Sequence, residues 1–110
     1  FMLIFRHPAD IVQFEDYYNN LLALIERMPH VQRRQVVHVV GSPNGTSPYY
    51  RILEVYYPSA ILGQASLLSP IGQEAGAELA KFAAGVVELI FADVFEEQGG
   101  STPKASGVQQ

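Results

Sequence analysis

The chain has 110 residues, of which 48% are hydrophobic and only 16% are charged, and its net charge is −4. This length suits a single domain with one modest core, and the acidic balance argues against a nucleic-acid partner, because neutralising phosphates needs an excess of lysine and arginine. The absence of cysteine excludes disulfides, thiol nucleophiles and zinc–thiolate sites, and no apolar run approaches the roughly 20 residues of a membrane span, so we expect a cytoplasmic protein.

The first third of the chain predicts a buried strand followed by a long helix. The run FMLIFR at residues 1–6 is apolar almost throughout, which is typical of a strand covered on both faces. Asp10 can cap the next helix, with a glutamine three residues later as in a capping box. Apolar residues then recur at helical spacing from Phe14 to Met28, and Pro29 ends the helix because it cannot continue it.

The middle of the chain predicts two strands joined by a hairpin-type loop. Residues 31–40 are rich in β-branched side chains, and GSPNGTSP at 41–48 has the composition of an exposed loop. Residues 49–57 give a third strand, which Pro58 stops. We therefore expect the second and third strands to be neighbours in one sheet.

Two consecutive helices follow. Ser59 is a suitable cap for a short helix that ends at Leu68, and Ser69 followed by Pro70 suits the start of a new helix at a new angle. Gly76 and several alanines keep this second helix slim, which predicts the close approach of another backbone. The small residues of this stretch are therefore interpreted as packing and carry no chemistry.

The remaining residues complete a ferredoxin-like α+β domain. Gly85 ends the helix, VVELIFADVFEE at 86–97 reads as a fourth strand, and residues 98–110 have the composition of a flexible tail. The order β-α-β-β-α-β, with the second helix split, predicts a four-stranded antiparallel sheet with its helices on one face, over residues 1–97.

The other face of this sheet is too apolar for a monomer. Such a face normally meets water and is polar, but the first strand is apolar throughout, and the second and fourth carry apolar residues on both alternations. A second copy of the same sheet is the simplest cover. We therefore predict a homodimer whose two sheets pack face to face, which is a dimeric α/β barrel.

Three stretches resemble the EthD family of small dimeric barrel proteins. They are FEDYYNNLLALIERMP at 14–29, YRILEVYY at 50–57 and SPIGQEAGAELAKFAAGVVELI at 69–90, in which a Ser-Pro-x-Gly-Gln turn leads into an alanine-rich helix. The resemblance covers the chain from Phe1 to about Glu97. The family is named for a protein associated with bacterial breakdown of ethyl tert-butyl ether. Related barrels include muconolactone-type isomerases, monooxygenases without metal or flavin, and haem-degrading enzymes.

The resemblance implies a protein of an ether- or xenobiotic-degrading pathway that binds a small apolar molecule in the dimer barrel. Its implied chemistry is isomerase-type or monooxygenase-type and needs no cofactor. Many members carry a histidine in the first helix, in a segment like Tyr-x-x-x-His-x-Pro-Leu, but Leu22 stands at the histidine position here, and Leu24 at the proline position. This departure makes the first helix more apolar. We expect the pocket to be lined by Tyr18, Leu22, Ile52 and Tyr56.

Three titratable side chains are candidates for chemistry inside the barrel. His38 lies among valines, where a buried imidazole can act as a general base; the alternative is a core or interface histidine with one hydrogen bond. Strand alternation points Glu54 and Glu88 into the barrel, where they can bind the polar end of an apolar ligand or move a proton. The alternative is an interface pair, with Arg34 and Tyr50 as partners across the two-fold axis.

Two further readings remain open. One is a non-enzymatic dimeric binding or assembly module, whose barrel interior would be packed solid by side chains. The other is haem handling, which needs an axial ligand, and His38 is the one histidine expected to be buried. The three histidines lack the spacing of a metal site, so we expect no metal and no cofactor.

Overall fold

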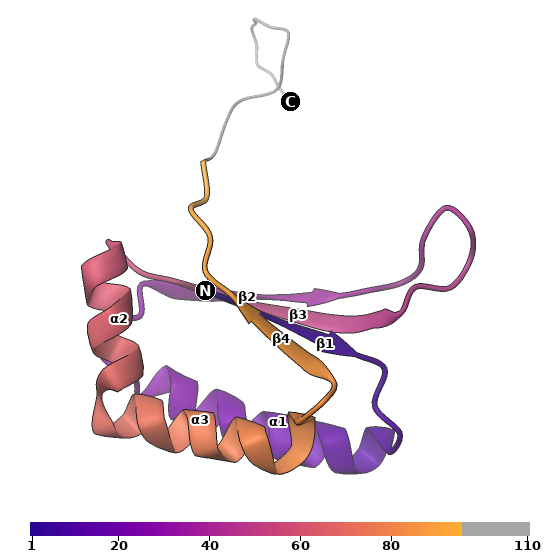
Figure 1. The fold of residues 1–110 in the computed structure, drawn as a ribbon, viewed down its shortest axis with the longest axis horizontal. Helices are drawn as coiled ribbons and strands as arrows, with labels where there is room; N and C mark the ends of the chain where they lie inside the picture. The colour runs from indigo at the N-terminus through magenta and orange to yellow at the C-terminus, as the bar shows by residue number, and fades with distance from the viewer. Residues whose placement is uncertain (96–110) are drawn as a thin grey trace, which may run out of the picture.

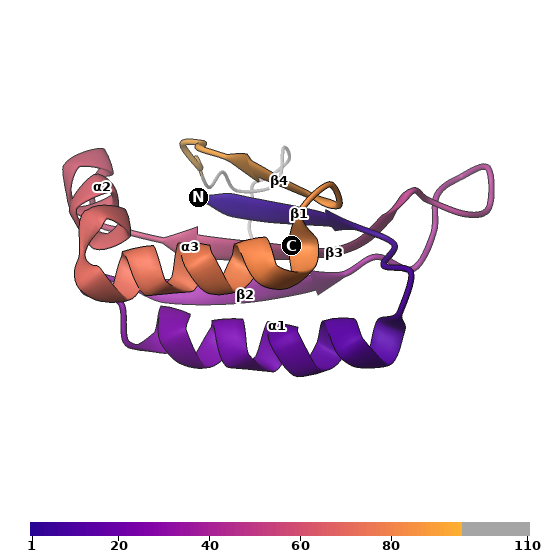
Figure 2. The same cartoon turned by 60° about the horizontal axis from the view of Figure 1, so that its bottom comes forward.

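A four-stranded antiparallel sheet carries two long helices side by side on one of its faces (Figures 1 and 2). The computed structural model describes residues 1–95. The sheet has the strand order β2-β3-β1-β4, and the ferredoxin-like α+β fold with a split second helix is confirmed. The elements in chain order are β1 (Met2–Arg6), α1 (Ile11–Glu26), β2 (Arg33–His38), β3 (Tyr49–Tyr56), α2 (Ala60–Leu68), α3 (Pro70–Ala83) and β4 (Val87–Ile90).

The helix α1 begins where the sequence predicts. The Asp10 carboxylate accepts a hydrogen bond from the backbone N–H of Gln13 at 3.0 Å, which caps the helix. Its apolar stripe packs on the sheet, and α1 ends at Glu26, before Pro29. The buried side chains between this stripe and the sheet form the core, and they include Phe14, Tyr18, Leu21, Ile25, Leu3, Phe5, Leu53 and Val55.

The corner between α2 and α3 depends on Ser69. Its hydroxyl accepts from the backbone N–H of Gly72 at 3.0 Å, which caps α3, and donates to the carbonyl of Ser66 at 2.6 Å. A side chain on Gly72 would overlap that same carbonyl, whereas the space around Gly76 is open. The close backbone approach predicted from Gly76 is therefore not found. The crowded glycine is Gly72, which lies against the carbonyls of Ser66 and Leu67 in the last turn of α2.

The fourth strand is much shorter than predicted. β4 covers Val87–Ile90, and residues 91–95 have no regular structure. Its one neighbour is β1, whose first residue, Met2, pairs with Ile90. Among residues 1–95 the ladder has no pair beyond this one. Residues 96 and 97 and the predicted tail at 98–110 lie outside the described residues.

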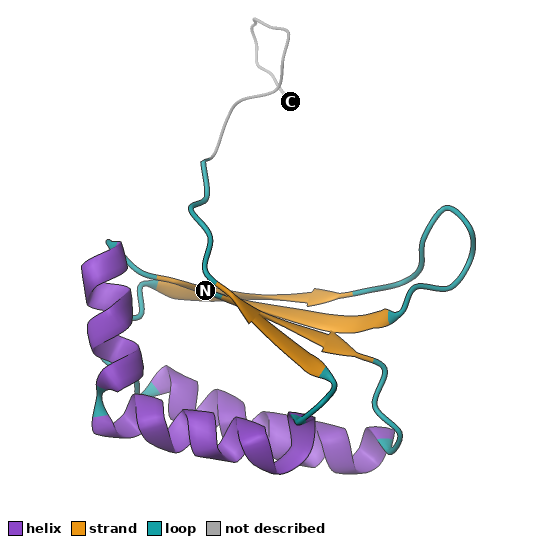
Figure 3. Ribbon diagram, in the orientation of Figure 1, coloured by secondary structure: helices purple, strands orange, loops and turns teal. Residues whose placement is uncertain are grey.

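The register assigns the side chains to two faces. Residues directly opposite each other in an antiparallel pair share a face, and Leu3 pairs with Leu53 on the face that the helices cover. The opposite face, here called the open face, is covered by none of the helices of residues 1–95 (Figure 2). The β2–β3 loop at 39–48 extends past one end of the sheet (Figure 3). The open face carries Met2, Ile4, Arg6, Arg33, Gln35, Val37, Ile52, Glu54, Tyr56, Glu88 and Ile90.

Candidate functional site

The structure separates the three predicted catalytic candidates. Glu54 and Glu88 lie on the open face. His38 pairs with Arg51 on the helix-covered face, and its side chain is exposed at the edge of the sheet. The prediction of a buried histidine is therefore wrong, and His38 does not join the two glutamates. It is also not the buried axial ligand that haem handling would need.

The polar side chains of the open face are paired within the chain. Glu88 accepts a hydrogen bond from Arg6 at 2.6 Å. Glu54 accepts from the hydroxyl of Tyr56, which raises the pKa of that hydroxyl. The guanidinium of Arg33 lies 4.0 Å from the centre of the Tyr56 ring, so this end of the face is a closed polar cluster.

The partners predicted for the two glutamates are engaged elsewhere. Arg34 donates to Glu26 at 2.6 Å and to the carbonyl of Leu22 at 3.1 Å, and both acceptors belong to α1. Tyr50 donates to Glu15, also on α1. The proposed interface pairs with Arg34 and Tyr50 are therefore wrong, because both side chains point to the helix side.

The four predicted pocket residues do not surround one cavity within the chain. Tyr18 is buried between α1 and the sheet, and Leu22 packs against the same core. Ile52 and Tyr56 lie on the open face instead. The sheet separates the two pairs, so a single pocket lined by all four is not formed inside one protomer.

A buried arginine stands at the centre of a cluster that the sequence analysis missed. Arg51, on β3, is 5% exposed. Its two terminal nitrogens donate to the two carboxylate oxygens of Glu15 on α1, at 2.7 and 2.8 Å. Tyr50 donates its hydroxyl to the same carboxylate at 2.7 Å. These three residues, together with Tyr18, are called the Arg51 cluster below.

A bulge in β3 brings two consecutive residues of the cluster to the same side. The register of β1 and β3 shifts after Phe5, which pairs with Arg51, to Arg6, which pairs with Tyr49. Tyr50 is thereby left out of the ladder, and a bulge of this kind re-aims a side chain. Its ring meets Phe14 of α1 edge to face at 5.4 Å, so Tyr50 faces α1 together with Arg51.

Aromatic rings surround the guanidinium. Its central carbon lies 4.5 Å from the ring centre of Tyr18, 5.1 Å from that of Tyr50 and 5.6 Å from that of Phe14. A cation over aromatic faces is stabilised by the ring quadrupole, most strongly where water is excluded. The rings that surround Arg51 therefore present mainly apolar surface, and their faces also stabilise a cation.

The ion pair is held in its charged form. The hydrogen bonds from Arg51 lower the pKa of the Glu15 carboxyl, against a rise from partial burial, and the Tyr50 bond adds to the lowering. The same contacts raise the pKa of Arg51. The bond to Glu15 raises the pKa of the Tyr50 hydroxyl, which stays protonated. At neutral pH the cluster is a carboxylate, a guanidinium and neutral phenols.

Two buried polar atoms of the cluster have no hydrogen-bond partner among the described residues. They are the hydroxyl of Tyr18 and Nε of Arg51. Burial raises the pKa of Tyr18, with the charge of Arg51 acting against it. Unpaired buried polar groups are rare in folded proteins, and each needs an explanation.

The cluster opens to solvent on one side. The side chain of Glu15 is 35% exposed, and His38 lies exposed beside it, opposite Arg51 in the register. His7 meets the ring of Tyr50 at 5.6 Å.

One sequence signal could have found this cluster. Arg51 is a charged residue two positions before Leu53, so strand alternation places it on the same buried face of an apolar strand.

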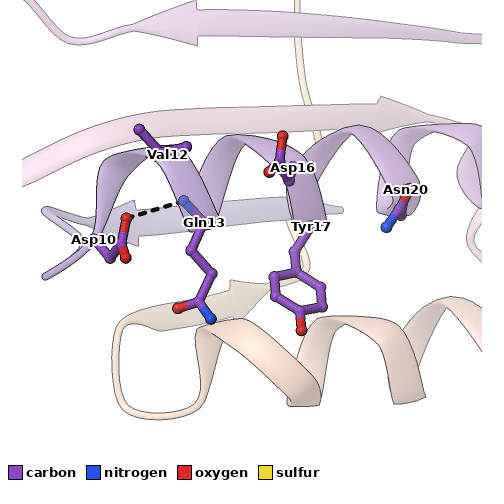
Figure 4. A pocket seen from close by; sticks show the side chains of 6 residues that line it. All are labelled: Asp10, Val12, Gln13, Asp16, Tyr17 and Asn20. Carbon is purple, nitrogen blue, oxygen red and sulfur yellow. Dashed lines mark hydrogen bonds between the residues drawn. The ribbon is translucent and has the colours of Figure 1, made fainter.

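The outer surface of α1 carries a separate shallow depression of about 530 Å³ (Figure 4). Gln13 and Tyr17 point from it towards α3, and the ring of Tyr17 stacks on Phe82 at 5.7 Å. It is open to solvent and lined by acids and amides of an exposed helix face, so it offers little enclosure. Its lining residues are Asp10, Val12, Gln13, Asp16, Tyr17 and Asn20.

Residues 1–95 hold neither a metal-binding cluster nor a membrane-spanning helix. No group of three or more histidine, aspartate or glutamate side chains in this part of the chain lies close enough together to hold a metal ion. No helix within it has the length and apolarity needed to cross a membrane. On the helix side of the sheet, the Arg51 cluster combines a charged pair, two phenol hydroxyls and two donors that have no partner among the described residues.

Comparison with known proteins relates the chain to one family. No family model matches the sequence. The chain is 31% identical over 93 residues to an uncharacterized 11.0 kDa protein from the thcB–thcC intergenic region of Rhodococcus erythropolis, a match that covers 83% of this chain and 89% of the relative.

Solved structures agree with this relationship. An ethyl tert-butyl ether (EthD) family protein from Bacillus halodurans superposes with a TM-score of 0.82 at 26% identity, covering 86% of this chain and 95% of that one. A dimeric ferredoxin-like protein of unknown function from Jannaschia sp. has a TM-score of 0.67 at 13% identity, with 84% and 96% covered, and shows the fold alone. By sequence and structure, the chain belongs to the EthD family.

Proposed function

We propose that this chain is a homodimer that binds a small, largely apolar organic molecule of a degradative pathway, with one site in each protomer at the Arg51 cluster. The observation that carries the proposal is the buried Arg51, paired with the partly exposed Glu15 beside an apolar core. The name of the EthD family, which refers to ethyl tert-butyl ether, supports the degradative role.

Stability alone gives a weak reason for burying this pair. Taking the charge of Arg51 out of water costs several kcal/mol, and well-packed apolar residues in place of a buried ion pair are often as stable or more so. Ionisable groups held in unusual environments are concentrated at functional sites. The aromatic rings around Arg51 provide apolar contact, and the partly exposed Glu15 is the edge of the cluster that meets solvent; apolar walls with a few polar groups are typical of small-molecule sites.

The open face is assigned to the dimer contact. Its central apolar side chains, which include Ile4, Val37 and Ile52, pair across three neighbouring strands. These side chains are half-buried within the protomer, and uncovered apolar patches mark contact surfaces. The sequence predicted that the ligand lies between two facing sheets. Because the open-face glutamates already have partners within the chain, we place the ligand on the helix side instead.

The test uses two double variants that each replace one α1–sheet ion pair by apolar residues. Glu15→Leu with Arg51→Met removes the buried pair, and Glu26→Leu with Arg34→Met removes the neighbouring, more exposed one. Native mass spectrometry of freshly purified protein, followed by denaturation, should show a dimer with a small adduct that is released. The adduct should be lost from the first variant and kept by the second.

A bare wild-type dimer that also binds no member of a set of small aromatic molecules would overturn the binding proposal. A monomer would overturn the dimer. A second candidate function, a dimeric assembly module without a ligand, is favoured by the closed pairing of Arg6 with Glu88 and of Glu54 with Tyr56. That function would give the bare dimer.

Isomerase-type or monooxygenase-type chemistry without a cofactor remains a prediction from the family resemblance. It has no assigned residue, because His38, Glu54 and Glu88 do not converge. If the ligand is transformed, the side chains within reach of it are the neutral Tyr18 and Tyr50 hydroxyls, while Glu15 is committed to Arg51.

A further inference from the structure

The Arg51 cluster contains hydrogen-bond donors that have no acceptor among the described residues, and these donors limit the chemical class of the ligand. A guanidinium has five N–H donors, and a carboxylate accepts on both oxygens. In Arg51 the terminal nitrogens are committed to Glu15, whereas Nε has no acceptor among the described residues. The hydroxyl of Tyr18, a residue that is only 3% exposed, likewise has no hydrogen-bond partner among the described residues. The cluster therefore offers a ligand hydrogen-bond donors.

The charge balance of the cluster disfavours an anionic ligand. The charge of Arg51 is already neutralised by its bidentate ion pair with Glu15. The chain as a whole carries a net charge of −4. A carboxylate entering beside this pair would be a buried, uncompensated charge, which is costly. If it displaced Glu15, it would exchange one carboxylate for another and gain little. A neutral oxygen avoids both costs.

From these two observations we propose that the ligand is a neutral molecule with a hydrogen-bond-accepting oxygen, such as a ketone or an ether, bound by Arg51 Nε, the Tyr18 hydroxyl or both. Its apolar part lies against the rings around Arg51. This inference rests on the proposed function and adds the chemical class of the ligand to it. Glu15 is then the residue that sets specificity, because its charge excludes carboxylates.

The experiment compares three probes of similar size: ethylbenzene, which has no acceptor, acetophenone, which has a neutral carbonyl, and benzoate, which is anionic. Binding is measured by NMR titration of the ¹⁵N-labelled full chain. The Nε–H resonance of Arg51, assigned by its absence in Arg51→Lys, reports directly on the proposed contact. Acetophenone should bind wild type about tenfold more tightly than either other probe and move this resonance, since a buried hydrogen bond contributes about a factor of ten or less.

Two single variants separate the roles of the donors and of the charge. Tyr18→Phe removes one oxygen that makes no hydrogen bond to a described residue, so the fold should be kept; binding of acetophenone should weaken about threefold to tenfold while that of ethylbenzene stays the same. Glu15→Gln leaves Arg51 with an unbalanced positive charge. In this variant benzoate should bind more tightly than acetophenone, reversing the wild-type order.

The outcomes distinguish failure of the inference from failure of the proposed function. If ethylbenzene and acetophenone bind wild type equally, or benzoate binds it best, the ligand class is wrong although a small-molecule site exists. If the order is right but the Arg51 Nε–H resonance does not move and Tyr18→Phe changes nothing, the assigned contacts are wrong. If no probe binds wild type, the proposed function and the inference both fall.

Discussion

Replacing Glu15 by alanine tests how far the buried guanidinium depends on its carboxylate. The variant removes the acceptor of two hydrogen bonds from Arg51 and of one from Tyr50. Arg51 is 5% exposed, so water reaches little of its charge, and removing one partner of a fully buried pair costs about 3–5 kcal/mol. The Glu15 side chain is itself 35% exposed, so water replaces part of the lost carboxylate, and we expect the free energy of unfolding to fall by about 2–3 kcal/mol.

Glu26→Ala is the matched control. Glu26 lies on the same helix and also pairs with a sheet arginine, at 2.6 Å from Arg34, but its side chain is 62% exposed. Exposed pairs contribute about 0.2–1 kcal/mol. Urea unfolding followed by circular dichroism, at neutral pH and one protein concentration, measures both losses. Equal losses in the two variants would refute the argument that burial makes the Arg51 pair different.

Three further predictions concern charge, backbone packing and assembly. Because hydrogen bonding lowers the pKa of folded Glu15, its stabilisation relative to Glu15→Gln should be complete above the unfolded-state pKa, about 4.3, and should disappear as pH falls through the lower folded-state value in an acid series of urea titrations. Gly72→Ala would overlap a backbone carbonyl and should destabilise by about 1–3 kcal/mol in thermal melts, whereas Gly76→Ala, which meets no atom, should stabilise by about 0.5–1 kcal/mol. Ile52→Lys on the open face should give a monomer in sedimentation, while Ile61→Lys, at a side chain 77% exposed on α2, should leave the dimer intact.

The fold could be predicted from sequence because its signals are local. Asp10, Ser59 and Ser69 each cap the helix that the sequence assigns to them, with a side-chain oxygen accepting from the backbone three residues on. The end of β4 could not be predicted in this way. The mostly apolar run continues to residue 95, but a strand also needs a hydrogen-bonding neighbour, and in the described part of the chain the pairing of β4 with β1 ends at Ile90.

The site could not be predicted because it depends on relations between distant elements. Alternation already places Arg51 on the same side as Leu53, yet nothing local shows that the carboxylate of Glu15 on α1 lies opposite it. The face of His38 depends on its partner in the register, Arg51, and not on its neighbours in the chain. The bulge at Tyr50 likewise becomes visible only when β3 is aligned with β1.

The two faces of the sheet differ in how completely their polar side chains are hydrogen-bonded among the described residues. On the open face the charged side chains are satisfied locally, as in Arg6 with Glu88. Beneath α1 the chain buries a charge and leaves two donors without a partner among residues 1–95, although a phenylalanine at position 18 would avoid one of those costs. Under the proposed function, the Tyr18 hydroxyl is the polar group of α1 that contacts the ligand. A core selected for stability alone has no reason to keep that hydroxyl.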